Sequence, residues 1–193
     1  MKLVSALMVK NEANRYLERV LKRCHEFSDS VLVLDDRSSD ATPSLARSLG
    51  CQVKGRSVLH GDAWGKEAPA RAELWDWAAK EAGDGWVLIC DGDMLLHGDP
   101  RPLTRSVETN AWAFILYDLW SDDERLYRCD GLWRAHTVPR PWMVRPGAFG
   151  SDFRPLWPAR GIHTGHFPVN APLHCGIAPP HEYYYLHLAY CRD

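Results

Sequence analysis

The chain has 193 residues, of which 46% are hydrophobic and 25% charged, and its formal net charge is −2. This composition is typical of a globular protein with a full core. The sequence contains no run of about 18 apolar residues, which is the length needed to cross a bilayer. Lysine and arginine form no basic run, so the charge pattern gives no reason to expect nucleic acid as the main partner. The six cysteines include no C-x-x-C pair, which argues against a zinc knuckle or a disulfide framework.

The first apolar run, residues 3–9, is short enough to be mistaken for part of a signal peptide. It has no small-residue cleavage site and leads directly into the polar residues 10–12. We therefore predict a buried strand here. With the scattered cysteines interpreted as reduced thiols, we expect a cytoplasmic protein.

Strand and helix patterns alternate through the first half of the chain. Continuous apolar runs predict buried strands, and apolar residues spaced by three and four predict helices. Thr42 and Pro43 are expected to be the cap and first residue of one helix. In chain order we predict a strand at 3–9, a helix at 13–25, a strand at 30–34, helices at 42–49 and 69–82, and a strand at 86–90. This order predicts an α/β fold with a mostly parallel sheet flanked by helices.

Polar residues follow three of the predicted strands, at 10–12, 35–36 and 91–93. Ligands of doubly wound sheets bind at the carboxyl ends of the strands, so these residues are expected to share one site. On an extended segment Asp91 and Asp93 point the same way, and Gly92 between them allows close approach. Carboxylates in this arrangement suit Mg²⁺ or Mn²⁺, although Asp-Gly-Asp is also a common turn sequence.

After residue 100 the residue types and their periodicity change. Residues 111–120 predict an aromatic strand, and from 121 onward Pro, Gly, Trp and His dominate without helical periodicity. We interpret this less regular half as the part that receives a second substrate. Five tryptophans in loops or near strand ends are candidates for stacking on a sugar ring, although most tryptophans serve only packing. They are Trp64, Trp120, Trp133, Trp142 and Trp157.

Residues 8–12, 33–42 and 88–93 resemble, in order and spacing, the family 2 glycosyltransferases of GT-A fold. The resemblance implies one GT-A domain over residues 1–193. Residues 1–100 would hold the nucleotide-sugar and metal, and residues 101–193 the acceptor. It also implies an enzyme that transfers a sugar from a UDP- or TDP-sugar to an acceptor hydroxyl with inversion, using Mn²⁺ or Mg²⁺; the acceptor and the oligomeric state stay open.

The resemblance also implies roles for individual residues. Arg71 would meet the aspartates or the diphosphate, for which a guanidinium is suited, although a surface pair with Glu67 or Glu73 is the alternative. The late histidine, His187, would be the third metal ligand, with His163 and His166 as competitors. The implied nucleotide-sugar-binding residues are Val9, Asn11, Glu12, Asp35, Asp36, Arg71 and Asp91, and the implied metal ligands are Asp91, Asp93 and His187.

Inversion at an anomeric carbon requires a general base to deprotonate the acceptor hydroxyl. Family members usually place the base carboxylate in the second half of the chain, before the late histidine. Where many relatives have a His-Glu pair, His163 is followed by Thr164 here. Asp152 is our first candidate and His163 the second. Asp118 and Glu182 stay possible, and each is individually more typical of a surface or turn residue.

Two other functions are compatible with the sequence. A nucleotidyltransferase has a related sheet, but usually carries a Gly-rich phosphate loop after its first strand, and residues 10–12 contain no glycine. A catalytically inactive module that binds nucleotide-sugar or carbohydrate is the other alternative. The intact Asp91 and Asp93 argue against it.

Overall fold

A parallel sheet forms the centre of the first half of the chain. The structure is a computed structural model and describes residues 1–57, 67–120, 126–132, 134–158, 166–189 and 191. Strand β1 (Leu3–Val9) lies between β2 (Ser30–Asp35) and β4 (Trp86–Asp91), and β3 (Gln52–Gly55) pairs with β2. All three pairings are parallel. Strand β3 is not predicted from the sequence, because its four residues are mostly exposed and form no apolar run.

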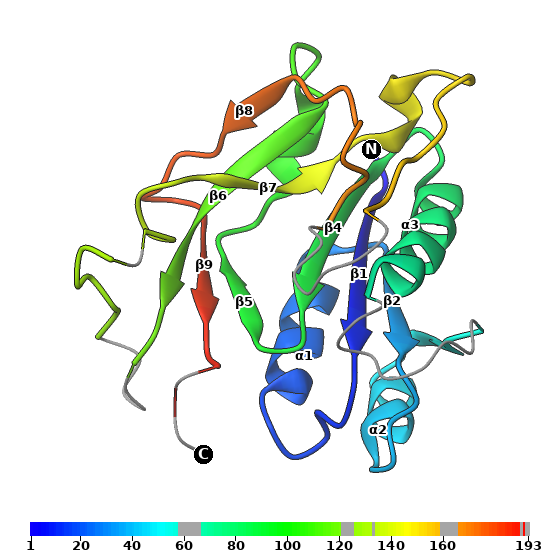
Figure 1. Cartoon of the computed structure of the whole chain (residues 1–193), viewed down its shortest axis with the longest axis vertical. Helices are drawn as coiled ribbons and strands as arrows, with labels where there is room; N and C mark the ends of the chain where they lie inside the picture. The colour runs from blue at the N-terminus through cyan, green and yellow to red at the C-terminus, as the bar shows by residue number, and fades with distance from the viewer. Residues whose placement is uncertain (58–66, 121–125, 133, 159–165, 190, 192–193) are drawn as a thin grey trace.

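Helices cover both faces of this sheet (Figure 1). Alternate strand residues belong to two core clusters. Leu7 and Val33 share one cluster with helices α1 (Leu17–Phe27) and α2 (Thr42–Ser48), whereas Ala6 and Leu32 share the other with α3 (Glu67–Ala82). Burial on both sides explains the continuous apolar runs. The predicted α/β fold class is confirmed.

The start of α1 and the capping of α2 differ from the prediction. Helix α1 begins at Leu17, four residues later than expected, because residues 13–16 form turns. Thr42 is not a cap: helix α2 begins at Thr42 itself, and its hydroxyl accepts a hydrogen bond from the Glu12 backbone N–H at 2.7 Å. Asp40 satisfies the Thr42 backbone N–H instead, at 2.9 Å. The side chains around α2 therefore tie it to the end of β1.

The second half continues the same sheet. Its strands are β5 (Met94–His97), β6 (Ala111–Asp118), β7 (Arg140–Val144), β8 (Cys175–Ile177) and β9 (Tyr184–His187). The strand order is β3-β2-β1-β4-β7-β6-β9-β5, with β8 paired to β6. Strand β6 ends two residues earlier than the predicted strand at 111–120.

The sheet has to curl, because β4 and β5 are neighbours in the chain but not in the sheet. Only Gly92 and Asp93 separate them, yet β7, β6 and β9 lie between them in the strand order. Met94 at the start of β5 is in register with His187, which in turn is in register with Asp118. The ends of β4, β6 and β9 are thereby brought to one place.

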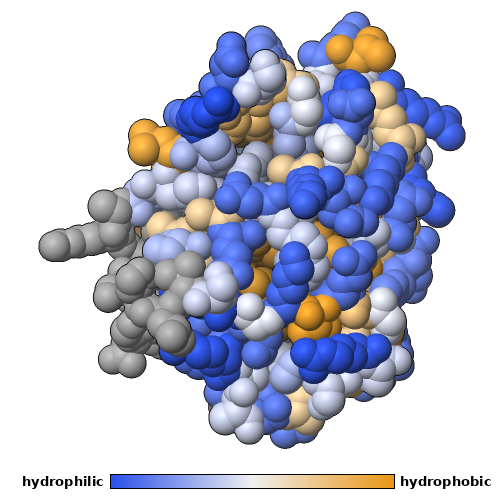
Figure 2. All heavy atoms as spheres, turned by 90° about the vertical axis from the view of Figure 1, so that its right-hand side faces the viewer, coloured by the Kyte–Doolittle hydropathy of each residue, from blue (hydrophilic) through white to orange (hydrophobic). Residues whose placement is uncertain are grey.

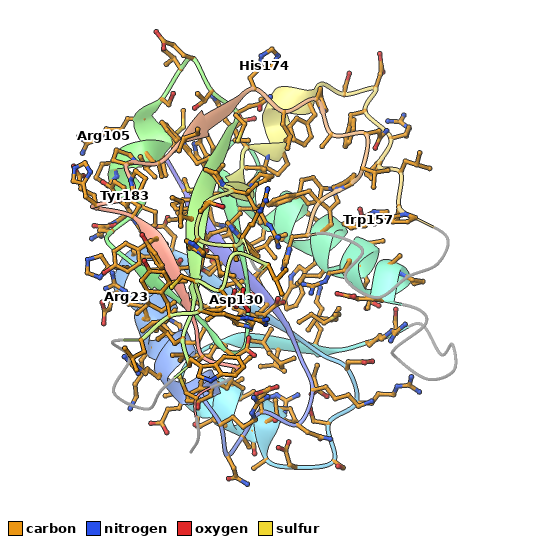
Figure 3. All side chains as sticks on the ribbon, turned by 60° about the vertical axis from the view of Figure 1, so that its left-hand side comes forward. Arg23, Arg105, Asp130, Trp157, His174 and Tyr183 are labelled. Atoms are coloured by element: carbon orange, nitrogen blue, oxygen red, sulfur yellow. The ribbon has the colours of Figure 1, made fainter. Side chains whose placement is uncertain are left out.

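Side-chain contacts attach helix α1 to the far end of β5. Arg23, which Figure 3 labels, donates hydrogen bonds to the carbonyl oxygens of Leu96 and Gly98, at 2.9 and 2.7 Å. On the α3 side of the molecule the surface is largely hydrophilic, with small separate hydrophobic patches (Figure 2). None of the helices in the described part of the chain is long and apolar enough to cross a membrane.

Candidate active site

Asp93, His187 and Asp118 meet where the curled sheet closes. Asp93 lies in the turn between β4 and β5, and its carboxylate lies 3.6 Å from Nε2 of His187. On the other side of the imidazole, Nδ1 is 2.5 Å from Oδ1 of Asp118. The backbone joins the same segments, because the Leu188 N–H donates to the Asp93 carbonyl at 2.9 Å. The structure thus brings together two of the three predicted metal ligands.

The Asp118 carboxylate fixes the orientation of the His187 ring. Asp118 is 1% exposed, so it holds Nδ1–H from inside the protein and leaves Nε2 directed to the Asp93 side. Burial alone would lower the pKa of His187, but hydrogen bonds and charge from Asp118 and Asp93 raise it to about 9. A histidine that ligates a metal usually donates its other N–H to a carboxylate in this way.

Asp91 belongs to a second group of charges. Its Oδ1 accepts a hydrogen bond from Nη2 of Arg71 at 3.0 Å, and its Oδ2 lies 3.2 Å from Nε2 of His166. Arg71 also donates through Nε to Glu67 at 2.8 Å. Both pairings considered for Arg71, with the aspartate and with Glu67, are therefore present at once.

The charges in this group strengthen one another. Burial would raise the pKa of the Asp91 carboxyl, but the positive charge of Arg71, followed by His166, holds it well below its usual range. Burial would likewise lower the pKa of Arg71, and Asp91 and Glu67 raise it. Arg71 is 7% exposed, and its Nη1 has no hydrogen-bond partner within the described part of the chain. This buried donor is available to a ligand.

The donor chemistry fits a divalent metal held by Asp93 and His187, and Asp91 stays a predicted ligand. Both oxygens of Asp91 are already engaged by Arg71 and His166. Across the described ranges, no three acidic, histidine or cysteine side chains form a complete metal cluster. A site of one carboxylate and one imidazole leaves positions for phosphate oxygens and water, as Mg²⁺ sites commonly do.

The residues predicted to bind the nucleotide lie at the ends of β1 and β2. Val9 is in register with Asp35, and the Asn11 side chain accepts a hydrogen bond from the Ser39 N–H at 2.8 Å. Burial raises the pKa of Glu12, Arg15 lowers it, and the charge of Asp93 raises it further, so Glu12 lies near the proposed metal pair. Gly92 lies close to both end residues, since a Cβ on it would lie 3.3 Å from the Glu12 side chain and 3.4 Å from that of Val9.

Asp36 has a structural partner. It is 5% exposed, and its Oδ1 accepts a hydrogen bond from Nη1 of Arg56 at 2.9 Å. The neighbouring Asp35 accepts the Ser38 N–H. The pair therefore organises the loop after β2, and Asp36 is committed to Arg56 in this arrangement.

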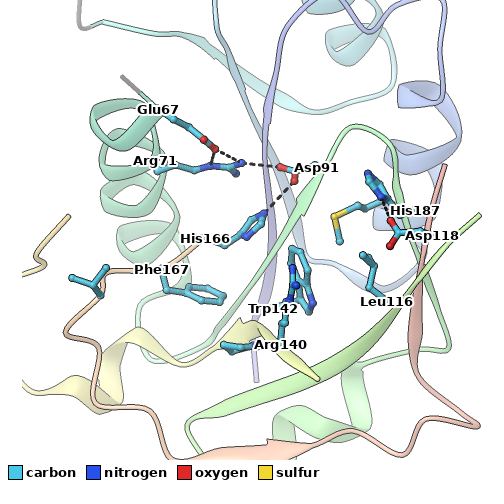
Figure 4. A pocket seen from close by; sticks show the side chains of 13 residues that line it. Glu67, Arg71, Asp91, Leu116, Asp118, Arg140, Trp142, His166, Phe167 and His187 are labelled. Atoms are coloured by element: carbon cyan, nitrogen blue, oxygen red, sulfur yellow. Dashed lines mark hydrogen bonds and ion pairs between the residues drawn. The ribbon is translucent and has the colours of Figure 1, made fainter. Parts of the chain in front are cut away.

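A cavity of about 470 Å³ lies beside these groups (Figure 4). Asp91 and Arg71 line one part, His187 and Asp118 another, and Trp142 and Arg140 a third. It lies at the strand ends, where the sequence predicts the ligand.

Of the two proposed bases, the one that the structure describes, Asp152, is not brought to this cavity. Asp152 is exposed and does not line it. It follows the short helix η3 (Pro146–Phe149), whose Gly147 approaches Asp84 before the start of β4, at the opposite end of that strand from Asp91. His163 lies outside the described residues, as do Trp64 and Trp133.

Three cavity residues acquire roles that the sequence did not indicate. Asp118 was considered only as a base, but it is the partner of His187. His166 was considered only as a metal ligand, but it contacts Asp91. Glu67 was expected at most to pair with Arg71 on the surface, yet it lines the cavity. The four-residue spacing of Glu67 and Arg71 on a helix is the one local signal that pointed to any of these contacts.

No protein-family model matches the sequence, and no curated protein matches it. Solved structures do resemble it. Glucosyl-3-phosphoglycerate synthase from Mycobacterium tuberculosis in complex with phosphoglyceric acid is similar with a TM-score of 0.55 and 19% identity, over 86% of this chain and 62% of that chain. The same enzyme with Mn²⁺, uridine diphosphate and glucosyl-3-phosphoglycerate gives 0.55 and 17%, over 91% and 68%.

The shared feature is the fold of a GT-A-like glycosyltransferase. Another structure of the M. tuberculosis enzyme contains Mn²⁺ and uridine-diphosphate-glucose, and is similar at a TM-score of 0.55 and 17% identity, over 91% of this chain and 68% of that chain. In the first of these comparisons the chain spans less than two thirds of the solved protein.

Proposed function

We propose that this protein is a metal-dependent glycosyltransferase of the family 2 type, which transfers a sugar from a UDP- or TDP-sugar to an acceptor hydroxyl. The observation that carries the proposal is the Asp93–His187 pair, held by Asp118 at the end of the curled sheet beside the cavity. Solved enzymes of this fold bind uridine diphosphate with Mn²⁺ or Mg²⁺, which supports the same donor chemistry here.

In this proposal each charged group has a distinct task. Asp93 and His187 hold the divalent metal, which when bound would offset negative charge on the leaving diphosphate. Arg71 keeps Asp91 ionised and directs its spare Nη1 donor to the diphosphate or the sugar. The base and ribose lie at the ends of β1 and β2, beside Val9, Asn11, Glu12 and Asp35.

The transfer is a displacement at the anomeric carbon. The acceptor oxygen forms a bond to that carbon as the bond to the diphosphate oxygen breaks, and the nucleoside diphosphate leaves with the electron pair. The acceptor proton passes to a general base, for which His163 stays our sequence-based candidate. We retain inversion as a prediction, and the anomeric configuration of the product, determined by NMR, tests it.

Thermal unfolding with ligands tests the proposed donor site. We expect UDP to raise the unfolding temperature only when Mn²⁺ or Mg²⁺ is present, since ligands that bind the native state stabilise it. Asp93→Ala should abolish this shift. Asp118→Asn should weaken metal-dependent binding by about tenfold to a hundredfold, because partners of metal-ligating histidines contribute that much.

Asp76→Asn is the matched control, since Asp76 is exposed on α3 and does not line the cavity. An equal shift with and without metal would exclude the Asp93–His187 site. Release of UDP from a panel of UDP-sugars separates an enzyme from an inactive binding module, which would bind them without turnover.

A further inference from the structure

The cavity contains an arginine that no described residue neutralises. Its three carboxylates, Glu67, Asp91 and Asp118, each form an ion pair with Arg71, His166 or His187. Arg140 lines the same cavity and is exposed at the start of β7. Within the described ranges its side chain forms neither a hydrogen bond nor an ion pair. A cation of this kind at a cavity wall attracts an anion.

Trp142, two residues further on, presents a second unused donor. It is 4% exposed, and its indole Nε1 is buried with no hydrogen-bond acceptor in the described parts of the chain. A buried donor without a partner destabilises the protein, and an acceptor atom of a bound ligand would remove that cost. Its ring is fixed against His166 and Tyr185, with centroid distances of 4.3 and 5.3 Å.

An irregularity in the sheet explains why these side chains share one wall. Trp112 of β6 is in register with Met143, but the next residue, Ala113, is in register with Pro141, so Trp142 is an extra residue on β7. Such bulges redirect side chains and occur often beside active sites. Arg140, Pro141 and Trp142 consequently all line the cavity. In Figure 4 Trp142 lies between the Asp91 end and Arg140.

The remainder of this wall is apolar. Leu116, Phe167 and Val169 also line the cavity. The cavity, at about 470 Å³, is in the range that holds a small molecule. Its occupant should therefore combine an anionic group with an apolar portion.

We propose that Arg140 and the indole N–H of Trp142 bind the anionic group of a small acidic acceptor, either a hydroxylated carboxylic acid or a hydroxylated phosphate ester. Its apolar portion packs on Phe167 and Val169, and the molecule extends from Arg140 toward the donor at Asp91. This inference rests on the proposed function, because it assigns the acceptor of the same transfer. Arg140 and Trp142 thereby determine acceptor specificity.

Calorimetric titration with three probes of similar shape tests the proposal: 4-hydroxyphenylacetate, 4-hydroxyphenyl phosphate and the neutral 4-hydroxyphenylacetamide. We expect at least one anion to bind more tightly than the amide. Arg140→Gln should lower the affinity for that anion by about tenfold to a hundredfold, since hydrogen bonds to charged groups contribute that much. The affinity for the amide should stay unchanged. Trp142→Phe keeps the ring, removes the N–H and should weaken the anion by a smaller factor.

The matched control is Arg105→Gln, since Arg105 is exposed in the short helix η2 (Arg101–Arg105) and does not line the cavity (Figure 3). It should bind every probe as the wild type does. The preferred anion distinguishes a carboxylic acid from a phosphate ester. Equal affinity for anions and amide, no binding of either anion, or unchanged affinity in Arg140→Gln would overturn the proposal.

The titrations are made first without nucleotide and then with UDP and Mn²⁺. Failure of UDP and Mn²⁺ to bind contradicts the proposed donor chemistry, whatever the acids do. Binding of UDP and Mn²⁺ without any preference for acids contradicts only the acceptor assignment.

Discussion

Arg71 connects the cavity wall to the core. Arg71 belongs to α3, and its buried side chain donates hydrogen bonds to Glu67 on the same helix and to Asp91 at the end of β4. Loss of one member of a buried ion pair is costly, because the remaining charge stays without compensation. The same residue therefore contributes to stability and to the electrostatics of the cavity.

Arg71→Gln should lower the free energy of unfolding by about 3 kcal/mol at pH 7, the lower end of the range for buried pairs, because Asp91 is partly exposed. The pKa of Asp91 is lowered in the folded protein. Its stabilising contribution is therefore complete above the unfolded value of about 4 and is lost as pH falls toward the folded value.

The difference in free energy of unfolding between the wild type and Arg71→Gln should accordingly be largest at neutral pH and become smaller below about pH 4. Urea unfolding at pH 7 and pH 3 measures it. Arg101→Gln removes an exposed pair with Asp99 and should change little at either pH. An equal difference for Arg71→Gln at both values would contradict this assignment.

Which site residues are predictable depends on how far apart they lie in the sequence. Asp91 and Asp93 directly follow a buried strand, so their position at a strand end is a local property. The contacts of Asp91 with His166 and of His187 with Asp118 join residues 75 and 69 positions apart. Only the order of the strands in the sheet brings these residues together, and patterns of neighbouring residues do not predict that order.

At the scale of elements, the junction after β5 sets the position of β9. Gly98 has φ of 81°, and a Cβ on it would lie 2.3 Å from the Glu182 carbonyl oxygen. The chain leaving β5 therefore passes directly against the segment that leads into β9, which carries His187 at its end.

Gly98→Ala should lower the free energy of unfolding by about 3 kcal/mol, through the positive φ and the close contact together. Gly131 provides the comparison, since its φ is 79° but a Cβ there would meet nothing within 4 Å. Gly131→Ala should lower that free energy by only about 1 kcal/mol. Denaturant unfolding of both variants measures this, and equal losses would mean that the contact with Glu182 is unimportant.

The elements themselves were predictable where the burial pattern is regular. Strands β1, β2 and β4 are mostly apolar and buried, and α3 differs from its predicted range by two residues at one end. The short strands β3, β5 and β8 were not predicted, because each has exposed or half-buried residues and too few positions to show a period. Sheet edges are thus the part of the fold that sequence patterns describe least.

For the whole molecule, burial in the core cluster on the α1 and α2 side of the sheet divides the cysteines by accessibility. Cys24, Cys51 and Cys90 are buried, whereas Cys129 and Cys175 are exposed. Burial, with a smaller effect from Cys24, raises the pKa of the Cys51 thiol to about 12, which further reduces its reactivity.

Iodoacetamide should therefore alkylate Cys129 and Cys175 in the native protein, and Cys129 faster, because burial raises the pKa of Cys175. The three buried thiols should react only as the protein unfolds. Mass spectrometry of digests over a time course, with and without urea, distinguishes the two groups. Rapid native alkylation of Cys90 would contradict the packing of β4 against α1.

The return of β5 and β9 to the end of β4 also dictates when the metal pair can exist during synthesis. Strands β1, β2 and β4 with their helices are complete once residue 91 has emerged from the ribosome. Asp93 cannot pair with His187 until β9, the last described strand, has been synthesised. A nascent chain can therefore build strands β1, β2 and β4 well before the proposed Asp93–His187 metal site can form, so cation binding at that site would report closure of the sheet rather than formation of its first strands.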